Sequence, residues 1–240
     1  MALVAYVGDS RTMTVDNLDA IADLVERIDP KIWLHADACH GFSLGFSKTL
    51  RHKIKGIERF DSISLDPHKV MLTPYTLSAL LVKDPEDMKN IMSRSDLIMQ
   101  EQFAFGQVTP FLGSKPWQSL KLWFMMKSFG KEGLDELITK RHELALYLAD
   151  VLKNDADFAV LNDVEINSVA FFYTGGERDV KKVNSMNKAV HARMLEEGEY
   201  HLHQFSIPDS GVFEKGTVVY PLRFMCGNPN VATEDVDCMV

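Results

Sequence analysis

Two residues in the first third of the chain have types and spacing that suit covalent chemistry on a carbonyl compound. Lys69 ends the segment DSISLDPHK at 61–69, and Asp37 ends the segment IWLHAD at 32–37. Each follows a short apolar run typical of a buried parallel strand, and their spacing fits one strand-helix-strand crossover. Because the carboxyl ends of neighbouring parallel strands share one crevice, we expect this amine and this carboxylate to face the same ligand.

A lysine opposite a carboxylate is the pair that pyridoxal phosphate requires. The lysine forms an imine with the aldehyde, and the carboxylate keeps the ring nitrogen protonated so that the ring withdraws electrons. Taken alone, Lys69 could be a surface lysine and Asp37 a cap for the next turn, but Lys69 follows an apolar strand end and a turn fixed by Pro67. We expect burial and nearby cations to lower the pKa of Lys69, which leaves a free amine.

A metal site is the rival interpretation of the segment from His35 to His40, because His, Asp and Cys are all metal-ligand types. On a strand, His35, Asp37 and Cys39 share one face, whereas His40 belongs to the turn. The sequence contains no second cluster with ligand spacing, so we expect no metal. It also lacks a Walker loop, a dinucleotide fingerprint and a Gly-x-Ser-x-Gly motif, which argues against a kinase, a dehydrogenase and a hydrolase.

The elements that position these residues follow a repeated strand-helix-strand pattern in the first half of the chain. The predicted strands are residues 3–7, 32–35, 62–65, 77–82, 169–173 and 218–225. The predicted helices are residues 15–28, 118–129, 134–154 and 180–197. We expect Asp16 to cap the first helix, and Gly130 and Gly133 to interrupt the long helical region. A domain boundary is therefore predicted at Gly130, with a first domain at 1–129 and a small α+β domain at 130–240.

Composition and charge limit the classes of partner. The formal net charge of -8 gives no basic surface for nucleic acid, so we expect no nucleic-acid partner. The three cysteines are widely separated, which fits reduced thiols in the cytoplasm better than a disulfide framework. The apolar run at 1–7 lacks a basic leader and stops at Gly8, so we expect neither a signal peptide nor a membrane span.

Four ordered segments carry a resemblance to a known family. They are HADAC at 35–39, DSISLDPHK at 61–69, SLKLWF with GKEGL at 119–134, and LRF with NP at 222–229. Together they resemble successive motifs of the group II pyridoxal-phosphate-dependent amino acid decarboxylases, which include glutamate and aromatic-amino-acid decarboxylases. The resemblance implies an α/β fold of the fold type I transferase-like class. That fold has a mostly parallel sheet with helices on both faces and a small C-terminal α+β domain.

The resemblance also implies roles for individual residues near the cofactor, pyridoxal 5'-phosphate. Lys69 would carry the internal aldimine, and Asp37 would hold the ring nitrogen. Cys39 would lie against one face of the ring. His68 and Ser62 would lie near the phosphate.

Three further positions follow from the same resemblance. Ser10, at the tip of the first strand, would place a hydroxyl near the cofactor, although the preceding residue is Asp9 where similar proteins have threonine. Arg223 would bind the substrate's α-carboxylate as a bidentate pair; judged alone, it could equally form a surface or interdomain salt bridge. Asp66 stands where many family members have asparagine, and its charge would repel a phosphate unless it faces away or pairs with a cation.

The implied activity is decarboxylation of an L-amino acid to the amine and carbon dioxide, in a cytoplasmic homodimer. The motifs do not specify the substrate's side chain. The stretch 84–116, which we interpret as a loop, lacks the tyrosine that reprotonates Cα in family decarboxylases, and Phe103 and Phe105 are the nearest in kind. Another carbon-carbon lyase and an oxidative deaminase therefore remain alternatives, the former because residues 37–39 also resemble sphingosine-phosphate lyases.

The chain begins inside a strand of buried type, so we expect it to be the C-terminal half of a larger enzyme. Taken alone, such a segment could be catalytically silent, because the glycine- and serine-rich phosphate cradle and the outer strands of similar proteins would be missing. Unpaired sheet edges promote association. We therefore expect weak cofactor binding and low solubility from residues 1–240 alone.

Overall fold

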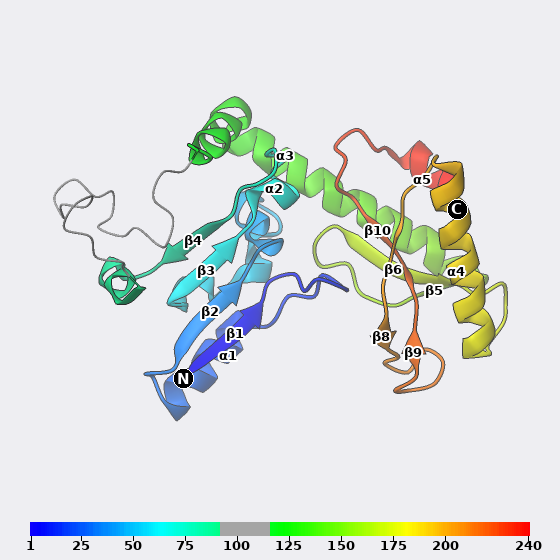
Figure 1. Cartoon of the computed structure of the whole chain (residues 1–240), viewed down its shortest axis with the longest axis horizontal. Helices are drawn as coiled ribbons and strands as arrows, with labels where there is room; N and C mark the ends of the chain where they lie inside the picture. The colour runs from blue at the N-terminus through cyan, green and yellow to red at the C-terminus, as the bar shows by residue number, and fades with distance from the viewer. Residues whose placement is uncertain (92–115) are drawn as a thin grey trace. The chain divides into compact units, whose positions relative to one another are not determined.

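The computed structural model describes residues 1–91 and 116–240, which divide into two compact units, each built on its own sheet (Figure 1). The first unit contains Met1–Val7, Asp16–Phe42 and the described part of Ile54–Lys131. The second contains Gly8–Val15, Ser43–Lys53 and Glu132–Val240. Within the described ranges, no helix has both the length and the apolar character needed to cross a bilayer.

The first unit has a four-stranded mixed sheet in the order β1-β2-β3-β4. Its strands are β1 (Ala2–Tyr6), β2 (Trp33–Asp37), β3 (Ser62–Leu65) and β4 (Ala79–Val82). β1, β2 and β3 are parallel, and β4 is antiparallel to β3, so the predicted mostly parallel sheet is confirmed. In β2, Leu34 and Ala36 are buried on one face, which directs Asp37 to the other.

Helix α1 (Leu18–Ile28) makes the crossover from β1 to β2, and its buried residues Leu18, Ala22 and Val25 form one stripe. Its N-cap is Asn17, whose Oδ1 accepts from the amide of Ala20 at 3.1 Å. The prediction that Asp16 caps this helix is wrong. Its Oδ2 instead accepts from the amide of Tyr6 at 2.8 Å, so this carboxylate is engaged at the end of β1.

Short helical turns complete the first half of the chain. They are η1 (Gly41–Phe46), η2 (Arg51–Ile54), η3 (Ile57–Arg59), α2 (Pro67–Val70) and η4 (Pro85–Ile91). Arg59, in η3, forms ion pairs with Asp19, Asp23 and Glu26 at 2.8 to 2.9 Å, and all three acids lie on α1. This network fixes the crossover helix to the segment that leads into β3.

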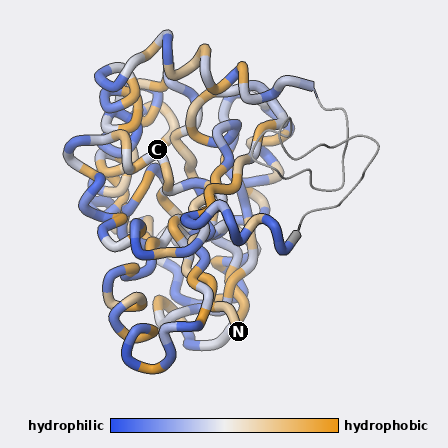
Figure 2. Tube along the Cα trace, turned by 90° about the vertical axis from the view of Figure 1, so that its left-hand side faces the viewer, coloured by the Kyte–Doolittle hydropathy of each residue, from blue (hydrophilic) through white to orange (hydrophobic). Residues whose placement is uncertain are grey.

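Helix α3 (Ser119–Lys153) covers both helices predicted in this region. Only Gly130, at φ 62° and ψ −173°, leaves the helical conformation, whereas Gly133 continues the helix. The C-terminal part of α3 is amphipathic and provides much of the second unit's core. That core includes Leu144, Ala145, Leu148, Leu152, Val164, Val169, Phe171, Leu202, Leu222 and Val236. In Figure 2 hydrophobic and hydrophilic residues alternate along the helical turns, as a helix with one buried face requires.

The second unit has an antiparallel sheet in the order β5-β6-β10-β7 and a two-stranded sheet of β8 and β9. Its strands are β5 (Phe158–Val160), β6 (Ser168–Tyr173), β7 (His203–Gln204), β8 (Ile207–Pro208), β9 (Val218–Val219) and β10 (Leu222–Met225). The prediction of one continuous strand at 218–225 is wrong, because β9 and β10 are separate strands. The ladder breaks around Pro221, which has no backbone N–H to donate. A short helix, α5 (Thr233–Met239), follows.

Helix α4 (Val180–Glu197) is held against β6 by Asn187, which is fully buried. The Asn187 amide donates to the carbonyls of Tyr173 and Val183 at 2.9 and 2.8 Å. Its Oδ1 accepts from the amide of Tyr173 at 3.0 Å. One side chain thus satisfies both backbone groups of the last β6 residue.

Replacing Asn187 with leucine is expected to lower the free energy of unfolding by about 2–3 kcal/mol, because the backbone N–H and C=O of Tyr173 would lose the partner that the fully buried Asn187 provides. Chemical denaturation measures this change. Asn184→Leu is the matched control on the same helix, since Asn184 also bonds two backbone groups, at Val218 and Tyr220, but is only half-buried. Equal losses in the two variants would contradict the prediction.

Candidate functional site

The ends of β2 and β3 bring a carboxylate and several donors together in the first unit. Asp37 and Ser64 are register partners. The Oδ1 of Asp37 accepts from the amide of Cys39 at 3.3 Å and from the Ser64 hydroxyl at 3.5 Å. The Cys39 thiol donates in turn to the Ser64 oxygen at 3.6 Å. The Asp37 carboxylate is therefore held at the carboxyl end of its strand, as predicted from the sequence.

Lys69 lies in α2, the single turn that follows β3. Pro67 begins this turn, and the amide of Lys69 donates to the carbonyl of Asp66 at 2.9 Å. The Lys69 ammonium forms an ion pair with Oδ2 of Asp66, also at 2.9 Å. The other oxygen of Asp66 accepts from the Ser78 hydroxyl. Asp66 therefore pairs with a cation, which is one of the two arrangements that the sequence left open.

The electrostatic environment of Lys69 is negative. Burial alone would lower the pKa of Lys69, but the hydrogen bond and charge of Asp66 outweigh it, with smaller contributions from Cys39 and Asp37. The pKa of Lys69 is therefore raised, and the predicted lowering is wrong, because the groups that act on Lys69 are acidic. Burial would raise the pKa of Asp66, but hydrogen bonds from Ser78 and Lys69 lower it overall.

Cys39 belongs to the same cluster. Burial, followed by its interaction with Asp37, raises the pKa of the Cys39 thiol to about 11, so this group is an uncharged thiol at neutral pH. Asp37 ends β2, and Lys69 lies in the turn that follows the neighbouring strand β3, so both predicted residues come after the carboxyl ends of adjacent parallel strands.

His68 precedes Lys69 in α2 and contacts the chain that leads to β4. Its Nδ1 lies 2.6 Å from the carbonyl oxygen of Leu77 and 3.3 Å from the Leu77 amide nitrogen. The shorter contact favours the tautomer with the proton on Nδ1. The imidazole also packs against Tyr75, with ring centroids 4.5 Å apart. His68 thus lies beside Lys69 and helps to fix the segment around Tyr75 and Leu77.

Ser62 is at the amino end of β3, two residues before Ser64 on the same face. Its Oγ accepts from Nε1 of Trp33 at 2.8 Å and lies 2.8 Å from Nδ1 of His35. These three residues line a cavity of about 500 Å³ together with Val4, Leu80, Val82, Asp87, Met88 and Asn90. Sequence reasoning chose Ser62 and missed Ser64, although the strand register, which pairs Asp37 with Ser64, contained the signal.

Ser10 and Arg223 lie next to each other in the second unit. Nη1 of Arg223 donates to the carbonyls of Ser10 and Arg11 at 2.6 and 3.1 Å. Nε of Arg223 is buried and has no hydrogen-bond partner within residues 1–91 and 116–240. Burial lowers the pKa of Arg223, opposed by the charge of Asp9. The described hydrogen bonds of Arg223 are therefore with backbone carbonyls, its guanidinium also lies 5.5 Å from the centroid of the Phe205 ring, and a buried donor remains available.

Asp9, the departure from the family pattern, closes the turn that contains Ser10. Its carboxylate accepts from the amides of Arg11, Thr12 and Thr14 at 2.8 to 3.1 Å and from the Thr12 hydroxyl at 2.5 Å. Burial would raise the pKa of Asp9, but these hydrogen bonds lower it overall. The carboxylate thus has a local structural function that threonine could not perform with the same number of acceptors.

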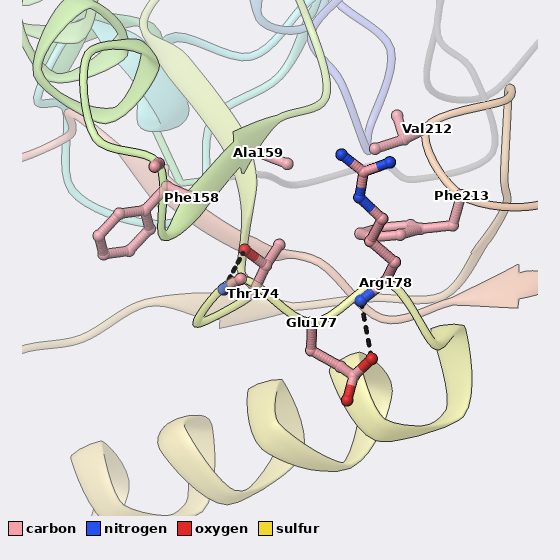
Figure 3. Close-up of a pocket in the computed structure, with 9 residues that line it drawn as sticks. Phe158, Ala159, Thr174, Glu177, Arg178, Val212 and Phe213 are labelled. Carbon is pink, nitrogen blue, oxygen red and sulfur yellow. Dashed lines mark hydrogen bonds between the residues drawn. The ribbon is translucent and has the colours of Figure 1, made fainter.

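A different cavity, of about 510 Å³, occurs in the second unit (Figure 3). It is lined by Ala156, Phe158, Ala159, Thr174, Gly176, Glu177, Arg178, Val212 and Phe213, and it contains none of the predicted site residues. The Glu177 carboxylate is already bound by Lys182 at 2.8 Å and by the amides of Arg178 and Asp179. We therefore do not regard this cavity as the site of the predicted chemistry.

Some predictions concern residues outside the described ranges. The tyrosine-free loop with Phe103 and Phe105 falls largely outside the described residues, and so do both phenylalanines. Within the described ranges, no group of three or more His, Cys, Asp or Glu side chains is arranged to hold a metal ion.

Known proteins resemble this chain in sequence. Residues 1–174 match the family model described as the pyridoxal-dependent decarboxylase conserved domain. The acidic amino acid decarboxylase GADL1 of Mus musculus is 30% identical over 94% of this chain and 42% of its own length. The cysteine sulfinic acid decarboxylase of Mus musculus is 29% identical over 94% of this chain and 47% of its own length. The chain thus spans less than half the length of these curated relatives.

Solved structures agree with the sequence matches. A crystal structure of mouse CSAD aligns with a TM-score of 0.85 and 26% identity, covering 99% of this chain and 50% of that one. This likeness confirms the predicted α/β fold of pyridoxal-phosphate-dependent enzymes. The family match covers well over half of the 240 residues and includes both Asp37 and Lys69. The chain therefore belongs to the pyridoxal-dependent decarboxylase family.

Proposed function

We propose that the whole protein decarboxylates an L-amino acid to the amine and carbon dioxide, with pyridoxal 5'-phosphate as its cofactor. The observation that carries this proposal is the arrangement at the ends of β2 and β3, where Asp37 is the register partner of Ser64 and Lys69 follows in the next turn, paired with Asp66 at 2.9 Å. Family membership supports the same reaction class. We further propose a cytoplasmic homodimer, which is the arrangement expected from the family resemblance.

The donor set fits the cofactor. Lys69 supplies the amine for its aldehyde, and Asp37 supplies a carboxylate, oriented by Ser64 and Cys39, for its ring nitrogen. When bound, pyridoxal phosphate supplies a ring that accepts the electrons released from Cα as carbon dioxide leaves.

The chain's own residues would bind and orient the cofactor. Lys69 would hold the cofactor covalently, and Asp37 would keep a proton on the ring nitrogen. The uncharged Cys39 thiol would contact the ring, and His68, Ser62 and Ser10 would be phosphate-side or cofactor contacts.

Arg223 would hold the substrate's α-carboxylate. Its buried Nε lacks a partner among the described residues, which supports a role in binding an anion. A guanidinium suits this role because it binds a carboxylate in a fixed, bidentate geometry. Fixing the carboxylate would also orient the bond that breaks.

Acidic amino acids are the first substrate class to test. The two curated relatives compared above are named as an acidic amino acid decarboxylase and a cysteine sulfinic acid decarboxylase. Aromatic amino acids form the second class, since an aromatic-L-amino-acid decarboxylase of Manduca sexta is 29% identical over 86% of this chain.

Product analysis tests the proposal. The whole protein, supplied with pyridoxal phosphate, is expected to release amine and carbon dioxide in equal amounts from at least one member of an acidic and aromatic amino acid panel. Asp37→Asn is expected to lower turnover by roughly 100-fold or more, because the carboxylate that keeps the ring nitrogen protonated is lost. Asp61→Asn is the matched control, since its acceptor for the Leu34 amide lies at the other end of the strands. Release of ammonia and an aldehyde without free amine would instead indicate oxidative deamination, and no product from a cofactor-loaded protein would overturn the proposal.

A further inference from the structure

Asp66 is an acidic residue in an unusual position, between β3 and the turn that carries the reactive lysine. It is 9% exposed, and both carboxylate oxygens are engaged. Oδ2 pairs with the Lys69 ammonium at 2.9 Å, and Oδ1 accepts from Ser78. The backbone carbonyl of Asp66 also accepts from the Lys69 amide at 2.9 Å. Asp66 therefore contacts Lys69 through both its side chain and its backbone.

This contact matters because an ammonium cannot attack a carbonyl carbon. The nucleophile is the uncharged amine, and a carboxylate next to a lysine stabilises the charged form instead. Among the described residues, the pKa of Lys69 is raised by Asp66, Cys39 and Asp37, and none of these three is a cation. The Lys69 side chain is still 32% exposed, so solvent can take up the proton that it releases.

We propose that Asp66 is a positioning residue for Lys69: it fixes the place of the amine and sets the pH above which that amine is free to attack a carbonyl compound. This inference rests on the proposed function, in which reaction with an aldehyde is the first task of Lys69. In that reaction the ammonium loses one proton to solvent and the nitrogen bonds to the carbonyl carbon. The carbonyl oxygen then leaves as one molecule of water, and no oxidant or reductant takes part.

The conservative change Asp66→Asn removes the charge and keeps an oxygen acceptor of similar size. Lys69 would then retain the burial that lowers its pKa and lose the largest influence that raises it. The titration midpoint of Lys69 is therefore expected to fall by at least about one pH unit, which gives about tenfold more uncharged amine at neutral pH. Asp66→Glu keeps the charge and is expected to keep the midpoint within about half a unit of the wild type.

The first measurement is independent of cofactor and activity. Lysines are dimethylated with ¹³C-formaldehyde and a reductant, the Lys69 signal is assigned with Lys69→Arg, and its shift is followed against pH by NMR. Asp61→Asn is the control for a carboxylate lost just before β3 and is expected to leave the midpoint unchanged. An Asp66→Asn midpoint within about 0.3 units of the wild type would overturn the proposal. If that variant does not fold, a wild-type midpoint at or below about 10.4, the ordinary lysine value, would overturn it equally.

The second measurement is the rate at which added pyridoxal phosphate becomes attached to the protein, trapped by borohydride and read by mass. Asp66→Asn is expected to attach about tenfold faster than the wild type at pH 7 and at a similar rate at high pH. An unchanged rate of attachment at pH 7 in a folded Asp66→Asn variant would contradict the proposed role of Asp66. Failure of the decarboxylation test with a shifted NMR midpoint would reject the proposed function and leave the role of Asp66 intact.

Discussion

Lys69→Ala is expected to abolish covalent attachment of pyridoxal phosphate and to lower turnover of the whole protein by at least about 1,000-fold. The reason is that Lys69 is the amine proposed to hold the cofactor, in the turn after β3 and paired with Asp66 at 2.9 Å. Attachment is measured by the absorbance band at about 420 nm that a protonated lysine imine gives. The mass increase after borohydride reduction provides an independent check.

Two further variants separate chemistry from folding. Lys69→Arg keeps a positive charge beside Asp66 but cannot form an imine, so it should lose the band as completely as the alanine variant. Lys83→Ala changes an exposed lysine just after β4 and should keep the band. A band that persists in both Lys69 variants would mean that another lysine is the reactive one.

Leu148→Ala is expected to lower the free energy of unfolding by about 2–5 kcal/mol, because it leaves a cavity in the core of the second unit. Leu148 is 0% exposed and lies on α3, in the same core cluster as Leu144, Leu152 and Val169. Denaturant titration followed by circular dichroism measures the change.

The same helix provides the matched control for this core substitution. Leu146 is two residues away on α3 and 45% exposed, so Leu146→Ala should change the unfolding free energy by about 0.5 kcal/mol or less. Similar losses in the two variants would mean that the C-terminal part of α3 does not bury the face described above.

Much of the fold could be predicted from local patterns. β3 and α4 have the predicted bounds. The ends of α4 are marked by strong signals, since Asp179 accepts from the first amides and Gly198 takes the left-handed conformation at φ 72°. Asp16 failed as a cap because a tertiary contact with Tyr6 uses its carboxylate. A single sequence does not reveal such a competing contact.

The candidate site, too, could be predicted only in part from the sequence. The positions of Asp37 at the end of β2 and of Lys69 in the turn after β3 could be predicted from the sequence, because topology alone places the ends of adjacent parallel strands together. Ser64 required the strand register, which the apolar pattern of β3 does not specify. The sign of the Lys69 pKa shift depended on the side-chain conformation of Asp66, and a rotamer cannot be read from residue order.

The hydrogen bond from Trp33 to Ser62 has a practical consequence for spectroscopy. The sequence has three tryptophans, and Trp117 and Trp123 are exposed, whereas Trp33 is half-buried. Trp33 also lies about 13 Å along β2 from Asp37 at the usual rise of a strand. Its indole is therefore an intrinsic fluorophore on the strand that ends at Asp37, and its emission can be followed during a cofactor titration without any attached dye.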